Sequence, residues 1–226
     1  AAQTAFLGGN NELAVGWFDQ ARYKNFADAE MYETLSEIFR SQGNLSKELS
    51  ALEYYSSNFS DSSDAVNSRL FDVYYEIEMY DKATVIWEKL HNAFKNENSK
   101  QKAFFKMNAK IENTAVCDSL SLLILEKEPE NIESLEWNAK KYYLLAENHY
   151  QEQMTFYEKN KTNRQYLILL EELKLVTTEF KKALPYFDKL WKLNPGKEYA
   201  GYLANIYARF GDEAKAKSYD KYLKNN

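Results

Sequence analysis

Small side chains recur in this sequence at intervals of about 34 residues, and the recurrence runs through the whole chain. A repeated unit of this length is one supersecondary element that cannot bury its apolar face alone, so neighbouring units must stack. The sequence therefore predicts an array of stacked repeats. The recurring column falls, at intervals of 34, 35, 34, 34, 32 and 33 residues, on Ala14, Glu48, Ala83, Cys117, about Gln151, Ala183 and Ala216.

The clearest unit lies in the segment 178–195. There Ala183, Phe187 and Leu190 occupy positions i, i+4 and i+7, and Pro195 follows five residues later. Residues at this spacing share one helix face, the small one lets a paired helix approach, and Pro ends the helix. This pattern resembles the second helix of a tetratricopeptide repeat. The resemblance implies an all-α fold, a right-handed α-solenoid of helix-turn-helix repeats.

The few turn-forming residues also favour helices. Only 7 Gly and 3 Pro occur in 226 residues, too few for the turns that an all-β chain needs every ~8–12 residues. Gly9, Gly43 and Gly211 lie where the two helices of a unit turn, and Gly tolerates the positive φ found past a helix end. We expect about 70–75% helix, about five helical hairpins and no β-sheet.

The repeat register predicts a single solenoid over residues 1–226. Residues 1–26 match a second helix whose first helix has lost at least half its length, so they form a half repeat. In the segment 131–160 no Gly or Pro interrupts an apolar stripe that runs straight through the expected turn. One long helix is favoured there, and a divergent repeat is the alternative. Complete repeats are predicted at about 29–60, 64–95, 98–129, 164–195 and 198–226.

The small-residue column and one proline make local predictions. Pro185 lies past the first turn of its predicted helix, so its missing N–H and its ring should cost a hydrogen bond and bend the helix. A helix that begins at Leu184 would accommodate this proline without a bend. Close helix approach should bury the small residues Ala14, Ala83, Cys117, Ala183 and Ala216.

Charge and composition exclude several classes of partner. With 29 Lys and Arg against 34 Asp and Glu, the net charge is −5, so the basic footprint of a nucleic-acid-binding protein is missing. No run of 18 apolar residues occurs, so we expect no membrane span. Cys117 is the one cysteine, which excludes an internal disulfide, and it is interpreted as a small apolar core residue.

Groups that could carry catalysis are scarce. His91 and His149 are far apart in the sequence and are interpreted as polar residues on helix surfaces. No Asp, Glu or Cys joins them at a spacing typical of metal ligands. The Gly8-Gly9 pair precedes a helix but follows no strand, so it is a turn and not a phosphate loop. We expect no enzyme activity, no metal and no cofactor.

The tetratricopeptide resemblance implies a binding surface. In that family the first helices of the units line a concave groove that holds an extended peptide or a partner helix. Glu33 and Glu37 stand where family members that grip a carboxylate use Lys and Asn, which argues against that binding mode. A solvated helix face of ordinary charge is the alternative interpretation. The predicted groove residues are Glu30, Glu33, Glu37, Arg40, Ser68, Asp72, Tyr75, Glu76, Lys102, Lys106, Lys110, Glu136, Lys140, Tyr143, Asn205 and Arg209.

This groove would be acidic at its N-terminal end and basic in the middle, so a basic protein or peptide is a candidate partner. The first hypothesis is a non-enzymatic scaffold or adaptor that binds another protein. The second is a glycan or small-molecule binding protein of a bacterial envelope, because 18 Tyr and 4 Trp could stack on sugars. The second requires Tyr75, Tyr142, Tyr143 and Tyr150 to line one open cleft. An unrecognised enzyme is the third, and the sequence specifies no oligomeric state.

The start of the chain and its amino-acid composition indicate where in the cell the protein acts. The chain starts with Ala1-Ala2-Gln3-Thr4 and no initiator Met, so an upstream segment was removed by a signal peptidase or by the choice of expressed fragment. Small residues there favour export. Lys outnumbers Arg and Asn is frequent, which suggests an AT-rich bacterial genome. We expect the bacterial periplasm or cell envelope, with the cytoplasm as the alternative.

Overall fold

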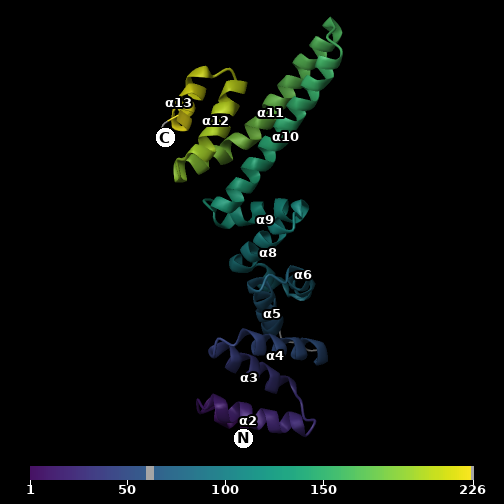
Figure 1. Ribbon diagram of the computed structural model, residues 1–226, viewed down its shortest axis with the longest axis vertical. Helices are drawn as coiled ribbons and strands as arrows, with labels where there is room; N and C mark the ends of the chain where they lie inside the picture. The colour runs from purple at the N-terminus through teal and green to yellow at the C-terminus, as the bar shows by residue number, and fades with distance from the viewer. Residues whose placement is uncertain (60–63, 225–226) are drawn as a thin grey trace. The chain divides into compact units, whose positions relative to one another are not determined.

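The computed structural model describes residues 1–59 and 64–224, and helices make up 84% of them. No strand occurs in the described chain, so the fold is all-α as predicted (Figure 1). The helical share exceeds the expected 70–75%, because α11 continues without a break through the turn expected in the repeat at 164–195.

Helical hairpins stack in two compact units, Ala1–Met107 and Asn108–Asn226, so the predicted solenoid over residues 1–226 is divided between Met107 and Asn108. In the first unit α1 packs on α2, α3 on α4 and α5 on α6, and these pairs stack through α2–α3 and α4–α5. This unit contains α1 (Ala2–Leu7), α2 (Asn11–Tyr23), α3 (Ala29–Ser41), α4 (Leu45–Asn58), α5 (Asp64–Glu76), α6 (Tyr80–Lys89), α7 (Asn92–Lys95) and most of α8 (Asn98–Lys110).

In the second unit two hairpins stack in the same way. α10 packs on α11 and α12 on α13, with further contacts between α9 and α10 and between α11 and α12. The α10–α11 hairpin is the longest element pair and extends beyond α12 and α13 (Figure 1). This unit contains α9 (Thr114–Lys127), α10 (Ile132–Lys159), α11 (Asn163–Leu193), α12 (Lys197–Arg209) and α13 (Glu213–Lys224).

The α1–α2, α3–α4, α5–α6, α8–α9 and α12–α13 turns share one backbone geometry, which the α10–α11 turn lacks. In each case one residue adopts a left-handed φ between 57° and 79°. A residue with a Cβ pays about 1–2 kcal/mol for this geometry, yet two glutamates adopt it, so a search for glycines finds only part of the pattern. The following residue often caps the second helix, as Asn44 does by accepting from the Lys47 N–H at 3.2 Å. The turn residues are Gly9, Gly43, Glu78, Glu112 and Gly211.

The small-residue column is buried as predicted. Ala14, Ala83, Cys117 and Ala183 are 0% exposed and Ala216 is 7% exposed, so each lies where two helices approach. Burial, with the Asp118 charge next to it, raises the pKa of the Cys117 thiol to about 11. The thiol therefore stays protonated, which agrees with its interpretation as a core residue.

Glu48 is the buried exception in this column, because a carboxylate stands where Ala14, Ala83, Cys117, Ala183 and Ala216 are small residues. Glu48 is only 2% exposed. Arg69 of α5 donates from Nε to Glu48 Oε1 at 2.6 Å and from Nη2 to Oε2 at 3.1 Å. Its Nη1 also donates to Glu76 at 3.2 Å. The buried charge of Glu48 is thus matched by a two-point contact with a guanidinium.

The long hairpin replaces one predicted repeat. The segment 131–160 is the single 28-residue helix α10, and Gln151, which the repeat register placed in the buried column, is exposed on it. The hairpin predicted at 164–195 is wrong, because α11 runs for 31 residues without a turn. Val176 and Phe180 are both buried on either side of the expected turn, so one apolar stripe continues against α10.

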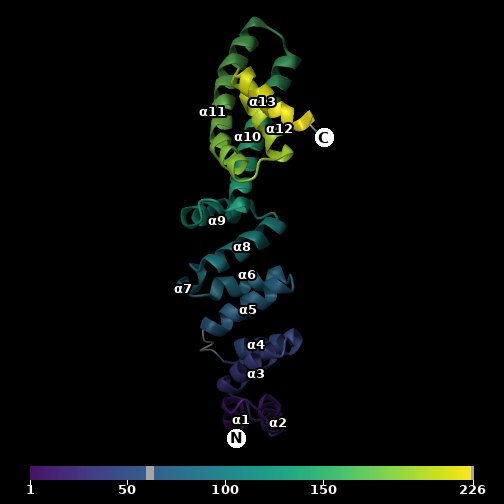
Figure 2. The same ribbon diagram turned by 90° about the vertical axis from the view of Figure 1, so that its left-hand side faces the viewer.

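Pro185 lies in the interior of α11, so the predicted helix start near residue 178 is also wrong. A proline there has no N–H for the carbonyl four residues earlier, and its ring crowds that carbonyl. Figure 2 shows α11 as a curved helix. The chain therefore keeps the helix intact and accommodates the proline by curvature.

Candidate functional site

Side chains of α10 and α12 meet along one surface of the second unit. The contacts join residue 136 to 199, 140 to 198, 143 to 202 and 147 to 209, so the two helices run in the same direction. We call this surface the α10–α12 face. It consists of Glu136, Lys140, Tyr143, Glu147 and Tyr150 of α10 and Glu198, Tyr199, Tyr202, Asn205 and Arg209 of α12.

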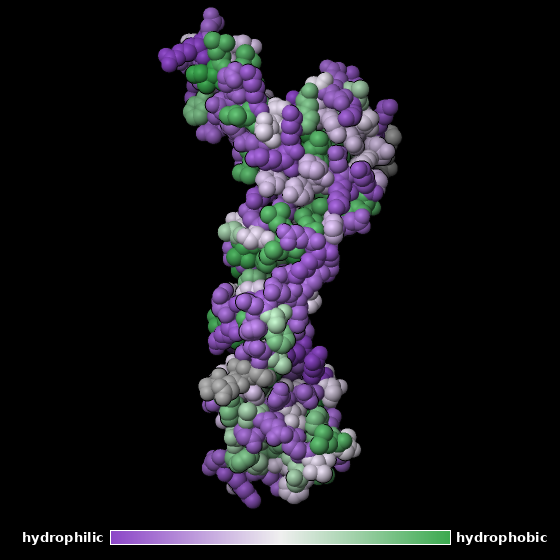
Figure 3. All heavy atoms as spheres, turned by 180° about the vertical axis from the view of Figure 1, so that it is seen from behind, coloured by the Kyte–Doolittle hydropathy of each residue, from purple (hydrophilic) through white to green (hydrophobic). Residues whose placement is uncertain are grey.

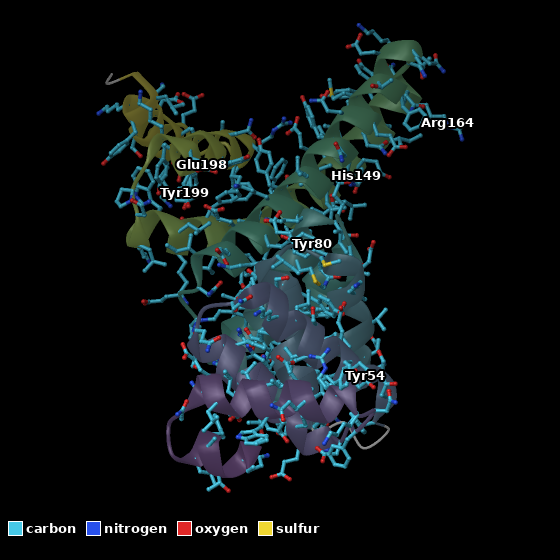
Figure 4. All side chains as sticks on the ribbon, turned by 60° about the horizontal axis from the view of Figure 1, so that its bottom comes forward. Tyr54, Tyr80, His149, Arg164, Glu198 and Tyr199 are labelled. Carbon is cyan, nitrogen blue, oxygen red and sulfur yellow. The ribbon has the colours of Figure 1, made fainter. Side chains whose placement is uncertain are left out.

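Charged and hydroxyl groups form one end of the α10–α12 face (Figure 4). Lys140 Nζ lies 2.9 Å from Glu198 and 3.4 Å from Glu136. The Tyr199 hydroxyl donates to Glu136 Oε1 at 2.5 Å. Burial lowers the pKa of Lys140, but the two carboxylates outweigh it and the pKa lies above its ordinary value. Burial and the Glu136 hydrogen bond raise the pKa of Tyr199, so both groups keep their protons.

Aromatic rings form the middle of the face. The Tyr143 ring stands edge-on to Tyr202, with centroids 4.7 Å apart, and edge-on to Phe180 at 5.4 Å. Tyr202 stacks on Phe187 at 4.6 Å. Burial raises the pKa of Tyr143 above its ordinary value. These packed rings hold their positions because each is fixed by a buried neighbour on α11.

A guanidinium closes the other end. The Arg209 Cζ atom lies 3.5 Å from the centroid of the Tyr150 ring, and its Nη2 donates to Glu147 Oε2 at 3.0 Å. The two partners are three residues apart on α10, so they lie on the same helix face. Cation–π contact and ion pair together orient a cation that stays partly open to solvent.

The structure places five of the predicted groove residues on this face, namely Glu136, Lys140, Tyr143, Asn205 and Arg209. Lys110 belongs to the same unit but lies on α8, outside this face. Five other residues of the face were not among the predicted groove residues. With 131–160 taken as one helix, steps of four and three residues from Tyr143 lead to two of them, Glu147 and Tyr150. The residues of the face that the predicted groove left out are Glu147, Tyr150, Glu198, Tyr199 and Tyr202, of which Tyr150 was named only for the glycan hypothesis.

In the first unit, α3 carries an exposed stripe of charge. Glu30, Glu33, Glu37 and Arg40 follow one another at three- or four-residue spacing on one side of the helix, where Glu33 is half-buried and the other three are exposed. We call the first three the α3 acidic stripe. Within residues 1–59 and 64–224 no ion pair reaches these three carboxylates. Their negative charge is therefore presented to solvent.

The α5 residues of the predicted groove are engaged inside the unit instead. The Lys100 ammonium forms an ion pair with Asp72 and donates to the Ser68 carbonyl at 2.9 Å. Ser68 is buried, and Glu76 accepts from Arg69. Asp72 is thus paired with Lys100, and Glu76 shares the Arg69 guanidinium with Glu48, so neither carboxylate of α5 adds an unpaired charge to the predicted acidic end of the groove. Tyr75 and Lys102 are half-buried, and Lys106 is exposed on α8.

Both histidines were interpreted as surface residues, and the structure agrees with this for His91 but not for His149. His91 is exposed and caps the short helix α7 by accepting from the Ala93 N–H. His149 is half-buried between Glu172 and Glu179 of α11. No group of three or more described His, Cys, Asp or Glu side chains is arranged to hold a metal ion.

Three of the four tyrosines of the glycan hypothesis lie in the second unit, and these three do not line one cleft. Tyr75 lies in the first unit, Tyr143 and Tyr150 lie on the α10–α12 face, and Tyr142 lines a different hollow beside α11. The open aromatic cleft that this hypothesis requires is therefore not formed by the three tyrosines of the second unit. In the described part of the chain, no helix has the combined length and apolar character to span a bilayer.

Comparison of sequences identifies no relative: no family model and no curated protein matches the chain. Comparison of structures finds proteins with a similar fold. A Bacteroides ovatus protein, provisionally described as protein-binding, is 20% identical, with 94% of this chain and 96% of that chain covered and a TM-score of 0.61. MamA from Desulfovibrio magneticus is 15% identical, with 87% and 93% covered and a TM-score of 0.46.

A tetratricopeptide repeat protein from Parabacteroides merdae is 16% identical, with 83% of this chain and 77% of that chain covered and a TM-score of 0.41. At these identities the likeness concerns the fold. The chain has an all-α fold of stacked helical hairpins, which it shares with the Bacteroides ovatus protein, and its structural neighbours include tetratricopeptide repeat proteins.

Proposed function

We propose that this chain is a non-enzymatic scaffold that binds a protein partner along the α10–α12 face. The observation that carries the proposal is the ordering of Arg209, which Tyr150 and Glu147 hold in place while part of the guanidinium faces solvent. Side chains that are already ordered lose less conformational entropy when a partner arrives. Arg and Tyr are also the residue types that contribute most often to hot spots in interfaces.

The order of groups on the face indicates what the partner offers. Lys140 with its two carboxylates stands at one end, the rings of Tyr143 and Tyr202 in the middle, and Arg209 at the other end. This order suits a peptide segment with an apolar side chain between polar or charged ones. Electrostatic complementarity at the two ends would set its orientation.

Replacing Arg209 tests the α10–α12 face. We expect Arg209→Ala to weaken partner binding about tenfold or more, because a hot-spot residue contributes about 2 kcal/mol or more. The wild-type chain is used to isolate a partner from extracts of the source cell, and its affinity for each variant is then measured by calorimetry. Lys217→Ala is the matched control, since Lys217 is an exposed cation on α13. Equal affinities of the two variants would contradict this use of the face.

The α3 acidic stripe favours a partner that carries a basic segment. Three carboxylates on one helix face lie within about a Debye length of one another, ~10 Å at 0.1 M salt, so a cationic segment would relieve their repulsion. Such charges mainly raise the association rate and select the partner. The proposed scaffold would thus use the first unit for attraction of a basic partner.

Reversal of two charges tests whether the α3 acidic stripe attracts the partner. We expect Glu33→Lys with Glu37→Lys to slow association and to flatten its dependence on ionic strength, without a change in melting temperature, because exposed charges contribute little to folding. Stopped-flow measurements at several salt concentrations provide the rates. Asp81→Lys with Glu88→Lys on α6 is a control with the same change in net charge. If both double variants slow association equally, net charge and not the stripe is responsible.

A further inference from the structure

The α10–α11 hairpin has another surface, formed by two stripes with the same spacing. On α10 the stripe is Leu145, His149, Glu152 and Phe156, and on α11 it is Ile168, Glu172, Leu175 and Glu179. Positions i, i+4, i+7 and i+11 lie on one side of a helix, so each set forms a row. We call the two rows together the hairpin face.

His149 shows that the two rows adjoin. Its Nδ1 lies 3.0 Å from Glu179 and its Nε2 lies 3.2 Å from Glu172, so one imidazole spans the space between the helices. Burial lowers the pKa of His149, but the hydrogen bonds with these carboxylates outweigh it and raise the pKa above its ordinary value. Figure 4 places His149 along the hairpin, well short of Arg164 at its tip.

Apolar side chains of both rows are open to solvent: Leu145 and Phe156 end the α10 row, Ile168 lies at the hairpin tip, and Leu175 lies between Glu172 and Glu179. Leu145, Phe156, Ile168 and Leu175 are between 42% and 54% exposed. In Figure 3 the arm formed by this hairpin shows hydrophobic surface among hydrophilic surface. A hollow of about 350 Å³ lies next to Leu145 and is also lined by Tyr142, His149, Glu152, Glu179 and Lys182. A hollow of this size can take one apolar side chain of a partner.

We propose that the hairpin face is a second docking surface, which binds an amphipathic helix whose polar side carries Lys or Arg. The apolar residues of the two rows, Leu145, Phe156, Ile168 and Leu175, match the apolar stripe of such a helix, which lies along a groove and inserts anchors at intervals of about one turn. Among these apolar side chains stand the three carboxylates of Glu152, Glu172 and Glu179, against the ammonium of Lys182 and the imidazole of His149, which carries at most one further positive charge. This excess of negative charge selects a cationic helix.

The same charges argue against a second copy of this chain as the occupant. In a two-fold pairing of identical faces the central carboxylates of one copy would meet those of the other. Like charges brought together in an interface cost several kcal/mol. None of the eight residues of the hairpin face belongs to the α10–α12 face, so this proposal stands independently of the proposed scaffold function.

A synthetic helix tests the proposal directly. The probe is a fluorescent amphipathic peptide of about 18 residues, five helical turns, built from Leu on one side and Lys on the other. Its binding to the full chain is followed by fluorescence anisotropy. We expect Leu145→Asp with Leu175→Asp to weaken binding about tenfold or more, because both apolar anchors are lost. A peptide with Glu in place of Lys should bind at least tenfold more weakly.

The chain offers a matched control for this double variant. Leu144 and Leu167 lie on the same two helices and are 55% and 63% exposed, but each points about 100° away from its neighbour on the hairpin face. Leu144→Asp with Leu167→Asp should change the affinity less than twofold. Glu152→Lys should weaken binding several-fold at low salt and less at high salt.

Three results would overturn the proposal. The first is an equal effect of the two double Leu variants, and the second is equal binding of the Lys and Glu peptides. The third is self-association of the wild-type chain in analytical ultracentrifugation that Leu145→Asp with Leu175→Asp abolishes, because the hairpin face would then be a contact between copies.

Discussion

Arg69→Ala is expected to lower the free energy of unfolding by about 3–5 kcal/mol. The guanidinium of Arg69 makes both close contacts with the Glu48 carboxylate, which is almost fully buried. Removal of one partner of a buried ion pair leaves the other charge without compensation, which costs about this much. Urea denaturation of the full chain measures the loss. Arg40→Ala is the control, because Arg40 is exposed on α3 and should change stability by less than about 0.5 kcal/mol.

A double variant separates the lost ion pair from lost packing. Glu48→Ala with Arg69→Ala removes both charges and restores the small residue that Ala14 and Ala83 provide in the neighbouring repeats. We expect it to be more stable than Arg69→Ala alone, because no unpaired carboxylate is left buried. A double variant less stable than Arg69→Ala would assign the effect to packing.

Pro185→Ala is expected to stabilise the chain by up to about 3 kcal/mol. The substitution supplies an N–H for the carbonyl of Lys181 and removes the clash between that carbonyl and the ring, a penalty of about this size inside a helix. Pro185 is exposed, so the shorter Ala side chain gives up little buried surface. An increase in melting temperature by calorimetry would report the gain.

Pro195→Ala is the matched control for this effect. Pro195 follows the end of α11, where no helical hydrogen bond is missing. Its replacement only makes the unfolded chain more flexible, so it should cost about 0.4–1 kcal/mol. Opposite signs for the two substitutions are therefore expected. A loss of stability in Pro185→Ala would mean that the curvature of α11 is required for its packing on α10.

The helical repeat could be read from the sequence because its signals are local. The burial of Ala83 and Cys117 follows from a small residue recurring where two helices cross. The error at 164–195 has an equally physical origin. An apolar stripe looks the same whether a helix continues or turns, and only the burial of Val176 and Phe180 against α10 shows that α11 continues.

The candidate site was predictable one helix at a time. Lys140 and Tyr143 could be assigned to one face of α10 from their spacing. Their partners could not, since Glu136 meets Tyr199 across 63 positions of sequence, a pairing that depends on how two separate helices are aligned. The same holds for Arg209 and Glu147, which lie 62 positions apart.

The sequence by itself determined an all-α chain of hairpins, the burial of the small column and the solvent-facing stripe of α3. These follow from a helical period of 3.6 residues and from residue size, which act within one or two turns. Only the tertiary structure decided which charges are neutralised, as Asp72 is by Lys100, and that His149 stands between two glutamates of another helix. The reason is that such pairings depend on the register between helices, and no local preference in the sequence encodes that register.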